Sequence, residues 1–357
     1  MFYMISFTIF MLNVIVSFAK RHSKILAFML LILSFVYMAA TNNSDGMNGD
    51  YWAYSQLYNH FISGGDISNI SGYSTDFGYM VLMILVSKLN VSYNIFVLFL
   101  SVVSFLLIFS TISKISNNYN VPLVLYTIFP FFYDVIQFRY FFAYSIIVYA
   151  LQFIVFEEKR SYVKYFILVI ISALFHITTL YFLIYLLLKF NLTKVLKLFG
   201  AFSILLTAVL FFGKINVVEL IYRIIPLEKV GKYATIGYKL NPLTSIAVML
   251  LILYLVYIVK YINAKRPCST NNIIFSLNLL SLVIVPFLLV SLDFERFFRP
   301  LLLVNYALIA KESNNLSKYK KIILLITVVA VLLVRLFMMR SHMFMVIKNN
   351  YIYEMFL

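Results

Sequence analysis

The residues best placed to do chemistry are Arg139 and His176, each within or at the end of an otherwise apolar segment of membrane length. A charge at the centre of a bilayer costs about 2.5–3.5 kcal/mol on insertion scales, so such residues need a partner, a watery cavity or a function. The guanidinium of Arg139 offers paired donors that suit a phosphate or a carboxylate. The imidazole of His176 titrates near neutral pH and can act as a general acid or base.

Both residues also have structural interpretations. Asp134 precedes Arg139 by five residues, and an ion pair between them would only fix the topology. His176 has no second histidine close enough in sequence to make a zinc pattern, and a lone histidine on an apolar face is more often a packing group. The residues alone leave these alternatives open.

A polar stretch at 41–77 combines carboxylates with aromatic rings. Rings stack on the C–H faces of sugars while acids accept hydroxyl hydrogen bonds, so the stretch suits sugar recognition. The alternative is an interfacial belt, where Tyr and Trp concentrate anyway. Residues 51, 52, 54 and 58 follow Asp50 at spacings that would share a helical face in part. The candidates are Asp50, Tyr51, Trp52, Tyr54 and Asp76.

A second polar stretch, DFERFFRPLLLVNY at 293–306, lies late in the chain. Arg296 and Arg299 are three residues apart, so on a helix they would share one face and could clamp a pyrophosphate. Mutual neutralisation with Asp293 and Glu295 is the alternative. Pro300 after them suits a first helical turn.

The segment 213–243 carries an excess of basic residues, among them Arg223. We place this segment outside the membrane, where the positive-inside rule disfavours Lys and Arg. A negatively charged ligand arriving from outside or from the outer leaflet is the simplest explanation.

The elements that position these residues are membrane helices. The chain of 357 residues is 63% hydrophobic and 12% charged, whereas soluble domains carry about 25% charged residues. We therefore predict an all-α, polytopic membrane bundle of about 10–13 transmembrane or re-entrant segments, forming one domain over 1–357. The net charge of +16 is explained by positive-inside topology and lipid contact, so no nucleic-acid partner is expected.

The basic joints fix the predicted orientation. We place in the cytoplasm the five clusters at 20–24, 159–164, 189–197, 260–266 and 311–321. The stretches 41–77 and 213–243 then lie outside, together with Arg139, His176 and the arginines near 296. Two apolar runs do not fit a simple count of membrane crossings. The run 78–112 is interrupted at 88–92, and the run 163–190 is either a hairpin turning near residues 176–179 or a re-entrant segment.

Several chemistries lack support in the sequence. It contains no GxxxxGK phosphate loop, HExxH, CxxC, GxSxG or GxGxxG motif, which removes the signatures of ATP hydrolysis, zinc hydrolysis and dinucleotide binding. The single cysteine, Cys268, rules out an internal disulfide.

The order of these motifs resembles the EpsG-like branch of the Wzy-type polysaccharide polymerases over nearly the whole chain. The matching motifs are Gly49-Asp50-Tyr51, Asp76-Phe77-Gly78-Tyr79, Phe138-Arg139-Tyr140, Phe175-His176-Ile177-Thr178 and Glu295-Arg296. The family commonly has Arg-Gln where this chain has Arg139-Tyr140, and often Glu where it has Asp76.

The resemblance implies a glycosyltransferase of the bacterial inner membrane that acts at its outer face. It would transfer a glycan from undecaprenyl pyrophosphate onto another lipid-linked repeat unit, for O-antigen, capsule or exopolysaccharide, without metal or cofactor. Its partners would be this substrate, membrane lipids and, as an open point, a chain-length regulator. The alternatives from other classes are a flippase for lipid-linked oligosaccharide and a membrane O-acyltransferase.

On this hypothesis the candidate residues take three roles. Arg139, Arg296 and Arg299 would bind the pyrophosphate, and His176 or Asp50 would accept the proton of the acceptor hydroxyl. Sugar and neighbouring charges would be held by Tyr51, Trp52, Tyr54, Asp76, Glu295 and Arg223.

Overall fold

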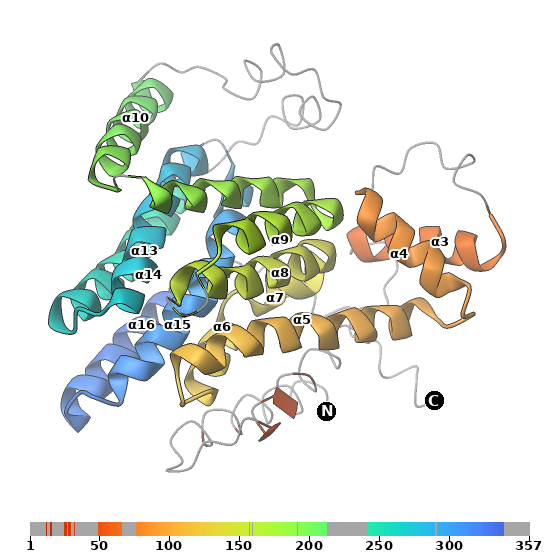
Figure 1. The fold of residues 1–357 in the computed structure, drawn as a ribbon, viewed down its shortest axis with the longest axis horizontal. Helices are drawn as coiled ribbons and strands as arrows, with labels where there is room; N and C mark the ends of the chain where they lie inside the picture. Colours follow the sequence, from red (N-terminus) through yellow and green to blue (C-terminus); the bar gives the residue numbers. More distant parts are fainter. Residues whose placement is uncertain are drawn as a thin grey trace. The chain divides into compact units, whose positions relative to one another are not determined.

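The structure is a computed structural model. It describes residues 49–65, 76–156, 158, 160–190, 192–212, 242–289 and 291–338, together with a few positions between 12 and 32. All regular secondary structure in these residues is helical, which confirms the predicted all-α class (Figure 1).

Four described helical stretches are long and apolar enough to cross a membrane: Tyr93–Ile115, Phe138–Val155, Ser245–Lys265 and Ser269–Leu289. They form α5, α8, most of α13 (Pro242–Lys265), and α14 (Ser269–Ser281) with the 3₁₀ helix η4 (Leu282–Leu289). Shorter apolar helices are Phe77–Ser87, Tyr162–Phe175, Ile177–Lys189 and Leu198–Ala208. The chain is thus a polytopic helical membrane protein, and the predicted number of 10–13 segments stays a prediction.

The chain divides into two compact units, one of residues 1–182 with 303–357 and one of residues 183–302. Each unit is described by itself below. The prediction of a single domain over 1–357 stays a prediction.

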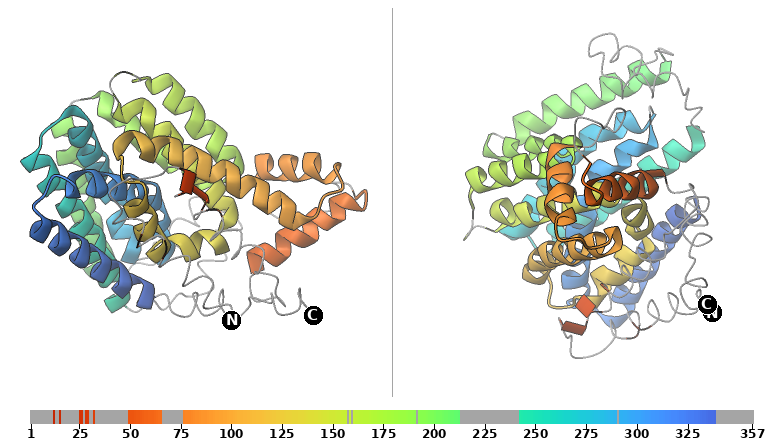
Figure 2. Two further views of the ribbon diagram at one scale, coloured as in Figure 1. Left: turned by 90° about the horizontal axis from the view of Figure 1, so that it is seen from below. Right: turned by 90° about the vertical axis from the view of Figure 1, so that its right-hand side faces the viewer.

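Helix α8 (Phe138–Val155) is the central helix of the first unit, between α5 (Tyr93–Ile115) and α9 (Tyr162–Phe175) (Figure 1 and Figure 2). Of its apolar window 83% is buried, against 50% for each of the other three spanning candidates. α8 runs parallel to α5, since Thr111 donates to the carbonyl of Val148 at 3.0 Å and Lys114 donates to Gln152 one turn further on. The most buried helix of the unit is therefore the one that carries Arg139 in its first turn.

Helix α9 packs antiparallel to α8. Ser172 donates to the Ala143 carbonyl at 2.7 Å, and the Phe142 and Phe175 rings meet edge to face with centroids 4.9 Å apart. The beginning of α8 and the end of α9 consequently lie at the same end of the pair.

The chain turns back at His176, which ends α9 in an extended conformation. The 3₁₀ helix η3 (Ile177–Lys189) follows, and Tyr165 in α9 donates to the Phe182 carbonyl at 2.8 Å. The chain thus reverses at residues 176–179, where the sequence places a turn, and the choice between a membrane hairpin and a re-entrant segment for 163–190 stays a prediction.

The polar stretch 41–77 is not a loop throughout, because residues Gly49–Ile62 form helix α3. Helix α4 (Phe77–Ser87) follows, and the break before α5 falls at residues 88–92, where the sequence predicts an interruption. α3 packs on both helices through rings: Tyr54 meets Tyr79 of α4 with centroids 5.4 Å apart, and Tyr58 stacks on Phe96 of α5 with centroids 5.3 Å apart.

The first unit also contains α6 (Asn120–Ile128), α7 (Phe131–Ile136), α16 (Lys318–Met338) and the part of α15 (Arg299–Ser313) from residue 303 on. Tyr306 of α15 donates to the Phe129 carbonyl at 3.0 Å. Arg335 of α16 is 1% exposed and donates to the Tyr133 hydroxyl at 3.0 Å. These long-range bonds tie α15 and α16 to the connection between α6 and α7.

The second unit contains α10 (Leu192–Phe212), α13, α14, η4 and the 3₁₀ helix η5 (Leu292–Phe298). Tyr185 at the end of η3 and Ser281 at the end of α14 are hydrogen-bonded at 2.6 Å. Arg299 begins α15, so Pro300 lies in its first turn, as predicted.

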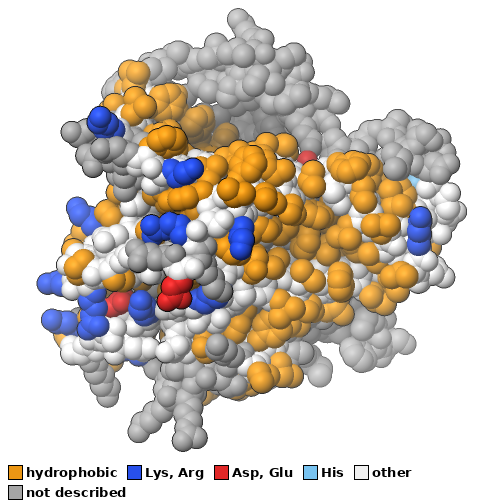
Figure 3. All heavy atoms as spheres, in the orientation of Figure 1, with side chains coloured by type: hydrophobic (Ala, Val, Ile, Leu, Met, Phe, Trp, Pro, Cys, Tyr) orange, Lys and Arg blue, Asp and Glu red, His pale blue; other side chains and the backbone are white. Residues whose placement is uncertain are grey.

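Apolar side chains cover much of the protein surface, as Figure 3 shows for one face. On α9 an exposed stripe follows helical spacing, as expected of a helix face turned to lipid. Its members are Val163, Phe166, Ile167, Ile170, Ile171 and Leu174.

Candidate functional site

Arg139 forms an ion pair with Asp76, a residue 63 positions earlier in the chain. Nη1 of Arg139, in the first turn of α8, lies 3.1 Å from Oδ2 of Asp76, the residue before α4. Each side chain is 13% exposed. Among the described residues these two atoms have no hydrogen-bond partner, so the contact is an ionic one without good hydrogen-bond alignment. Both groups keep hydrogen-bonding capacity for a ligand.

The alternative partner for Arg139, Asp134, has another role. Asp134 is fully buried in α7, and its Oδ2 accepts hydrogen bonds from the hydroxyls of Tyr126, at 3.0 Å, and of Tyr144. Arg139 therefore pairs with Asp76 and not with Asp134, the nearby carboxylate that the sequence offered as a partner.

Helix α3 brings aromatic rings to this ion pair. The guanidinium carbon of Arg139 lies 5.2 Å from the centre of the Tyr54 ring, within cation–π range. The Tyr54 ring in turn meets Tyr79 edge to face with centroids 5.4 Å apart. Tyr54 thus lies beside the charge, as a sugar-stacking or cation-holding ring would.

Tyr51 lies one turn earlier on α3. Its ring meets Tyr93 at 5.2 Å, and its hydroxyl donates to the side-chain oxygen of Asn94. Burial raises the pKa of Tyr51 to about 12, because the phenolate would lose hydration. Tyr51 is therefore a neutral hydrogen-bonding group throughout the physiological range.

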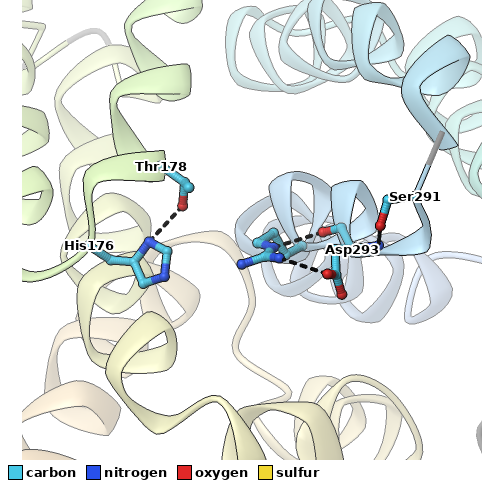
Figure 4. A network of polar contacts seen from close by, with 5 residues as sticks. His176, Thr178, Ser291 and Asp293 are labelled. Atoms are coloured by element: carbon cyan, nitrogen blue, oxygen red, sulfur yellow. Dashed lines mark hydrogen bonds and ion pairs between the residues drawn. The ribbon is translucent and has the colours of Figure 1, made fainter. Parts of the chain in front are cut away.

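His176 lies at the Arg139 end of the α8–α9 pair and is 9% exposed. Its Nδ1 is 2.7 Å from the Thr178 hydroxyl (Figure 4), and its ring meets the Tyr140 ring edge to face at 5.1 Å. When Nδ1 donates to Thr178, Nε2 carries the lone pair that a general base requires. Since Tyr140 directly follows Arg139, the structure brings the two residues with which the sequence analysis began to one region.

In the second unit, Arg296 is held by its own neighbour. Its Nε donates to the Asp293 carbonyl at 2.8 Å and its Nη2 lies 3.3 Å from the Asp293 carboxylate, while Ser291 caps the Asp293 amide (Figure 4). Arg299 is 2% exposed and Glu295 3%. The two arginines therefore differ in environment and do not form an open symmetrical clamp, and for Arg296 the structure favours the neutralisation that the sequence left open.

Three of the predicted residues lie outside the described part of the structure. Asp50 and Trp52 belong to α3, but their side chains lie outside the described part, as does the whole of Arg223.

Several residues that line the site are not among the candidate residues that the sequence gives. Tyr79 and Tyr93 are fully or nearly fully buried, and their hydroxyls are 3.2 Å apart. Tyr79 and Thr178 belong to the motifs that carry the family resemblance, and that membership was the available signal. Nothing local pointed to Asn94.

A bundle of apolar helices with an arginine–carboxylate pair, tyrosines and a histidine at helix ends defines a helical membrane protein with a polar site suited to an anionic ligand. The sequence model of the EpsG family matches residues 25–354, so the chain belongs to the EpsG family. Comparisons with curated proteins and with solved structures found no match. Within the described residues no group of three or more His, Cys, Asp or Glu could hold a metal ion.

Proposed function

We propose that this protein is a polysaccharide polymerase that transfers a glycan from undecaprenyl pyrophosphate onto another lipid-linked repeat unit. The observation that carries the proposal is the Arg139–Asp76 pair beside Tyr54, at the start of the most buried spanning helix of an EpsG-family chain. Following the predicted topology, the reaction takes place at the outer face of the bacterial inner membrane.

Arg139 binds the pyrophosphate of the donor in this mechanism. A guanidinium matches phosphate oxygens with two parallel donors, and a pyrophosphate brings more negative charge than the single carboxylate of Asp76. The ligand displaces Asp76, whose contact with Arg139 lacks hydrogen-bond alignment. As the bond breaks, Arg139 stabilises the charge that develops on the leaving pyrophosphate.

The reaction replaces one bond at the anomeric carbon by another and moves one proton. The hydroxyl oxygen of the acceptor sugar attacks the anomeric carbon of the donor, and the bond from that carbon to the pyrophosphate oxygen breaks with its electron pair leaving on the pyrophosphate. The hydroxyl proton passes to His176, oriented by Thr178, or to Asp50. The Tyr54 ring stacks on the sugar next to the pyrophosphate.

The roles of Arg296, Arg299, Glu295 and Arg223 in the same reaction stay predictions from the sequence. The contact of Arg296 with Asp293 is compatible with a binding role only if a ligand exchanges with that carboxylate. An Arg296→Ala variant with full polymerising activity would exclude this residue.

The experiment is polymerisation of a defined lipid-linked repeat by the purified protein, with products resolved by size. We expect a ladder of products from the natural protein, and loss of the ladder in Arg139→Ala and His176→Ala. Arg266→Ala, which removes an exposed arginine, is the matched control and should leave the ladder intact. Long products from Arg139→Ala at normal protein levels would refute the assignment.

A deletion strain separates polymerase from flippase. Loss of a polymerase leaves single repeat units on the cell surface, whereas loss of a flippase leaves no surface glycan. Loss of an O-acyltransferase would leave polymer length unchanged.

A further inference from the structure

Gly78, the second residue of α4, sits where α4 crosses α9. A Cβ atom added to Gly78 would lie 2.9 Å from both the Cβ and the carbonyl oxygen of Leu174. Ordinary van der Waals contact begins at 3.4 Å, so the helices would have to separate by about 0.5 Å. Two of the three closest atoms are backbone atoms of α9, which cannot rotate out of the way.

The need for glycine here is steric rather than conformational. Gly64 is the described glycine with a positive φ, and Gly78 is not in that region. The atoms nearest to a Cβ on Gly65 would be those of the His60 ring, and a Cβ on Gly200 would have no neighbour within 4 Å. Of these four glycines, Gly78 is thus the one with backbone atoms of a neighbouring helix among the nearest atoms to its Cβ.

This crossing lies directly at the proposed site. Asp76 precedes Gly78 by two residues and pairs with Arg139, while Leu174 precedes His176 by two residues. We infer that Gly78 is a positioning residue: its missing side chain lets the start of α4 approach α9 closely enough for Asp76 to reach Arg139. The inference rests on the proposed function for its effect on catalysis, but the contact that it explains is independent of substrate.

The direct test is Gly78→Ala, with Gly200→Ala as the matched control. Alanine is the better helix former, so propensity alone favours both variants. Gly200→Ala should retain full activity. Gly78→Ala should lower kcat/KM about 10-fold, because a displacement of about 1 Å in a catalytic arrangement can cost about 100-fold.

A rescue variant separates positioning from general damage. Asp76→Glu adds one methylene, which lets the carboxylate span a wider gap to Arg139. Alone it should lower activity, whereas combined with Gly78→Ala it should restore activity above that of either single variant. Leu174→Gly should not rescue Gly78→Ala, because the carbonyl oxygen at 2.9 Å remains.

Thermal unfolding of the same variants without substrate tests the inference apart from the reaction. Gly78→Ala should unfold at lower temperature than the natural protein, and the added Asp76→Glu should reverse much of that change. This pattern supports the positioning role even if the purified protein fails to polymerise, a failure that would count against the proposed function alone.

Other outcomes overturn the inference. Gly78→Ala with the activity and stability of Gly200→Ala would show that α4 has room for the methyl group. If Gly78→Ala does not accumulate in cells, the double variant of Gly78→Ala with Asp76→Glu is decisive. A double variant that accumulates and is active supports the positioning role. A double variant that also fails to accumulate shows that the defect is not the lost Asp76–Arg139 spacing.

Discussion

Removing the two members of the Arg139–Asp76 pair singly and together separates its structural from its functional role. At 3.1 Å and an effective dielectric constant of about 20, the Coulomb attraction is about 5 kcal/mol, partly offset by the desolvation of both charges. Removing one partner leaves the other charge buried and alone, which costs about 3–5 kcal/mol. With each side chain 13% exposed, we expect the lower end, about 3 kcal/mol, for Arg139→Ala and for Asp76→Ala.

The double variant should lose less free energy of unfolding than the two single variants lose together. It leaves no unpaired charge, so we expect a coupling of about 2–3 kcal/mol between the two positions. Polymerisation should behave differently. If Arg139 binds the pyrophosphate, Arg139→Ala with Asp76→Ala regains stability but stays at least about 100-fold below the natural protein in kcat/KM.

The measurements are thermal unfolding in detergent and product ladders from a defined lipid-linked repeat. The partly exposed pair Arg296–Asp293, at 16% and 39% exposure, is the stability control, since such pairs contribute about 0–1 kcal/mol. A double variant of Arg139 and Asp76 that regains both stability and polymerisation would refute the binding role. The pair would then be a structural link between α4 and α8.

Three further predictions concern neighbouring groups. Thr178→Val should lower kcat about 10-fold, with Thr178→Ser restoring it; an unchanged kcat in Thr178→Val would remove Thr178 from the mechanism. Tyr51→Phe should raise KM a few-fold without altering the pH profile between about pH 6 and 9, since the raised pKa of Tyr51, about 12, keeps the phenol protonated there; a changed alkaline limb would contradict this. Arg335→Leu should lower the free energy of unfolding by about 3 kcal/mol through loss of the Tyr133 hydrogen bond and the Phe129 ring contact at 5.4 Å, with kcat per folded molecule unchanged.

Local patterns in the sequence predict the helices and the turn at His176 well. Apolar runs of membrane length must form helices, because lipid offers no partners for backbone polar groups. The interruption at 88–92 and the position of Pro300 in a first turn followed from single residues whose preferences are strong. The type and the approximate bounds of these elements therefore lie in local sequence.

Local sequence patterns could not predict which side chains distant in the sequence contact one another. The sequence offered Asp134 for Arg139 because it is five residues away, whereas the structure pairs Arg139 with Asp76 and turns Asp134 to Tyr126 and Tyr144. Whether Arg139 pairs with Asp76 or with Asp134 depends on where α4 begins relative to α8. That placement follows from helix packing, which includes the close approach of α4 to α9 at Gly78.

The partial burial of the Arg139–Asp76 pair also bears on how the site works. A fully buried and well hydrogen-bonded pair would resist exchange, since separating it would leave two charges without solvent or partner. A fully exposed pair would hold neither helix in place. With 13% exposure and poor hydrogen-bond alignment, the pair can hold α4 against α8 when the site is empty and still yield to a ligand that brings more charge and two aligned acceptors. If the proposed function holds, Asp76 is the anion that keeps Arg139 in place until the pyrophosphate binds, a role that neither residue could reveal from its own sequence neighbourhood.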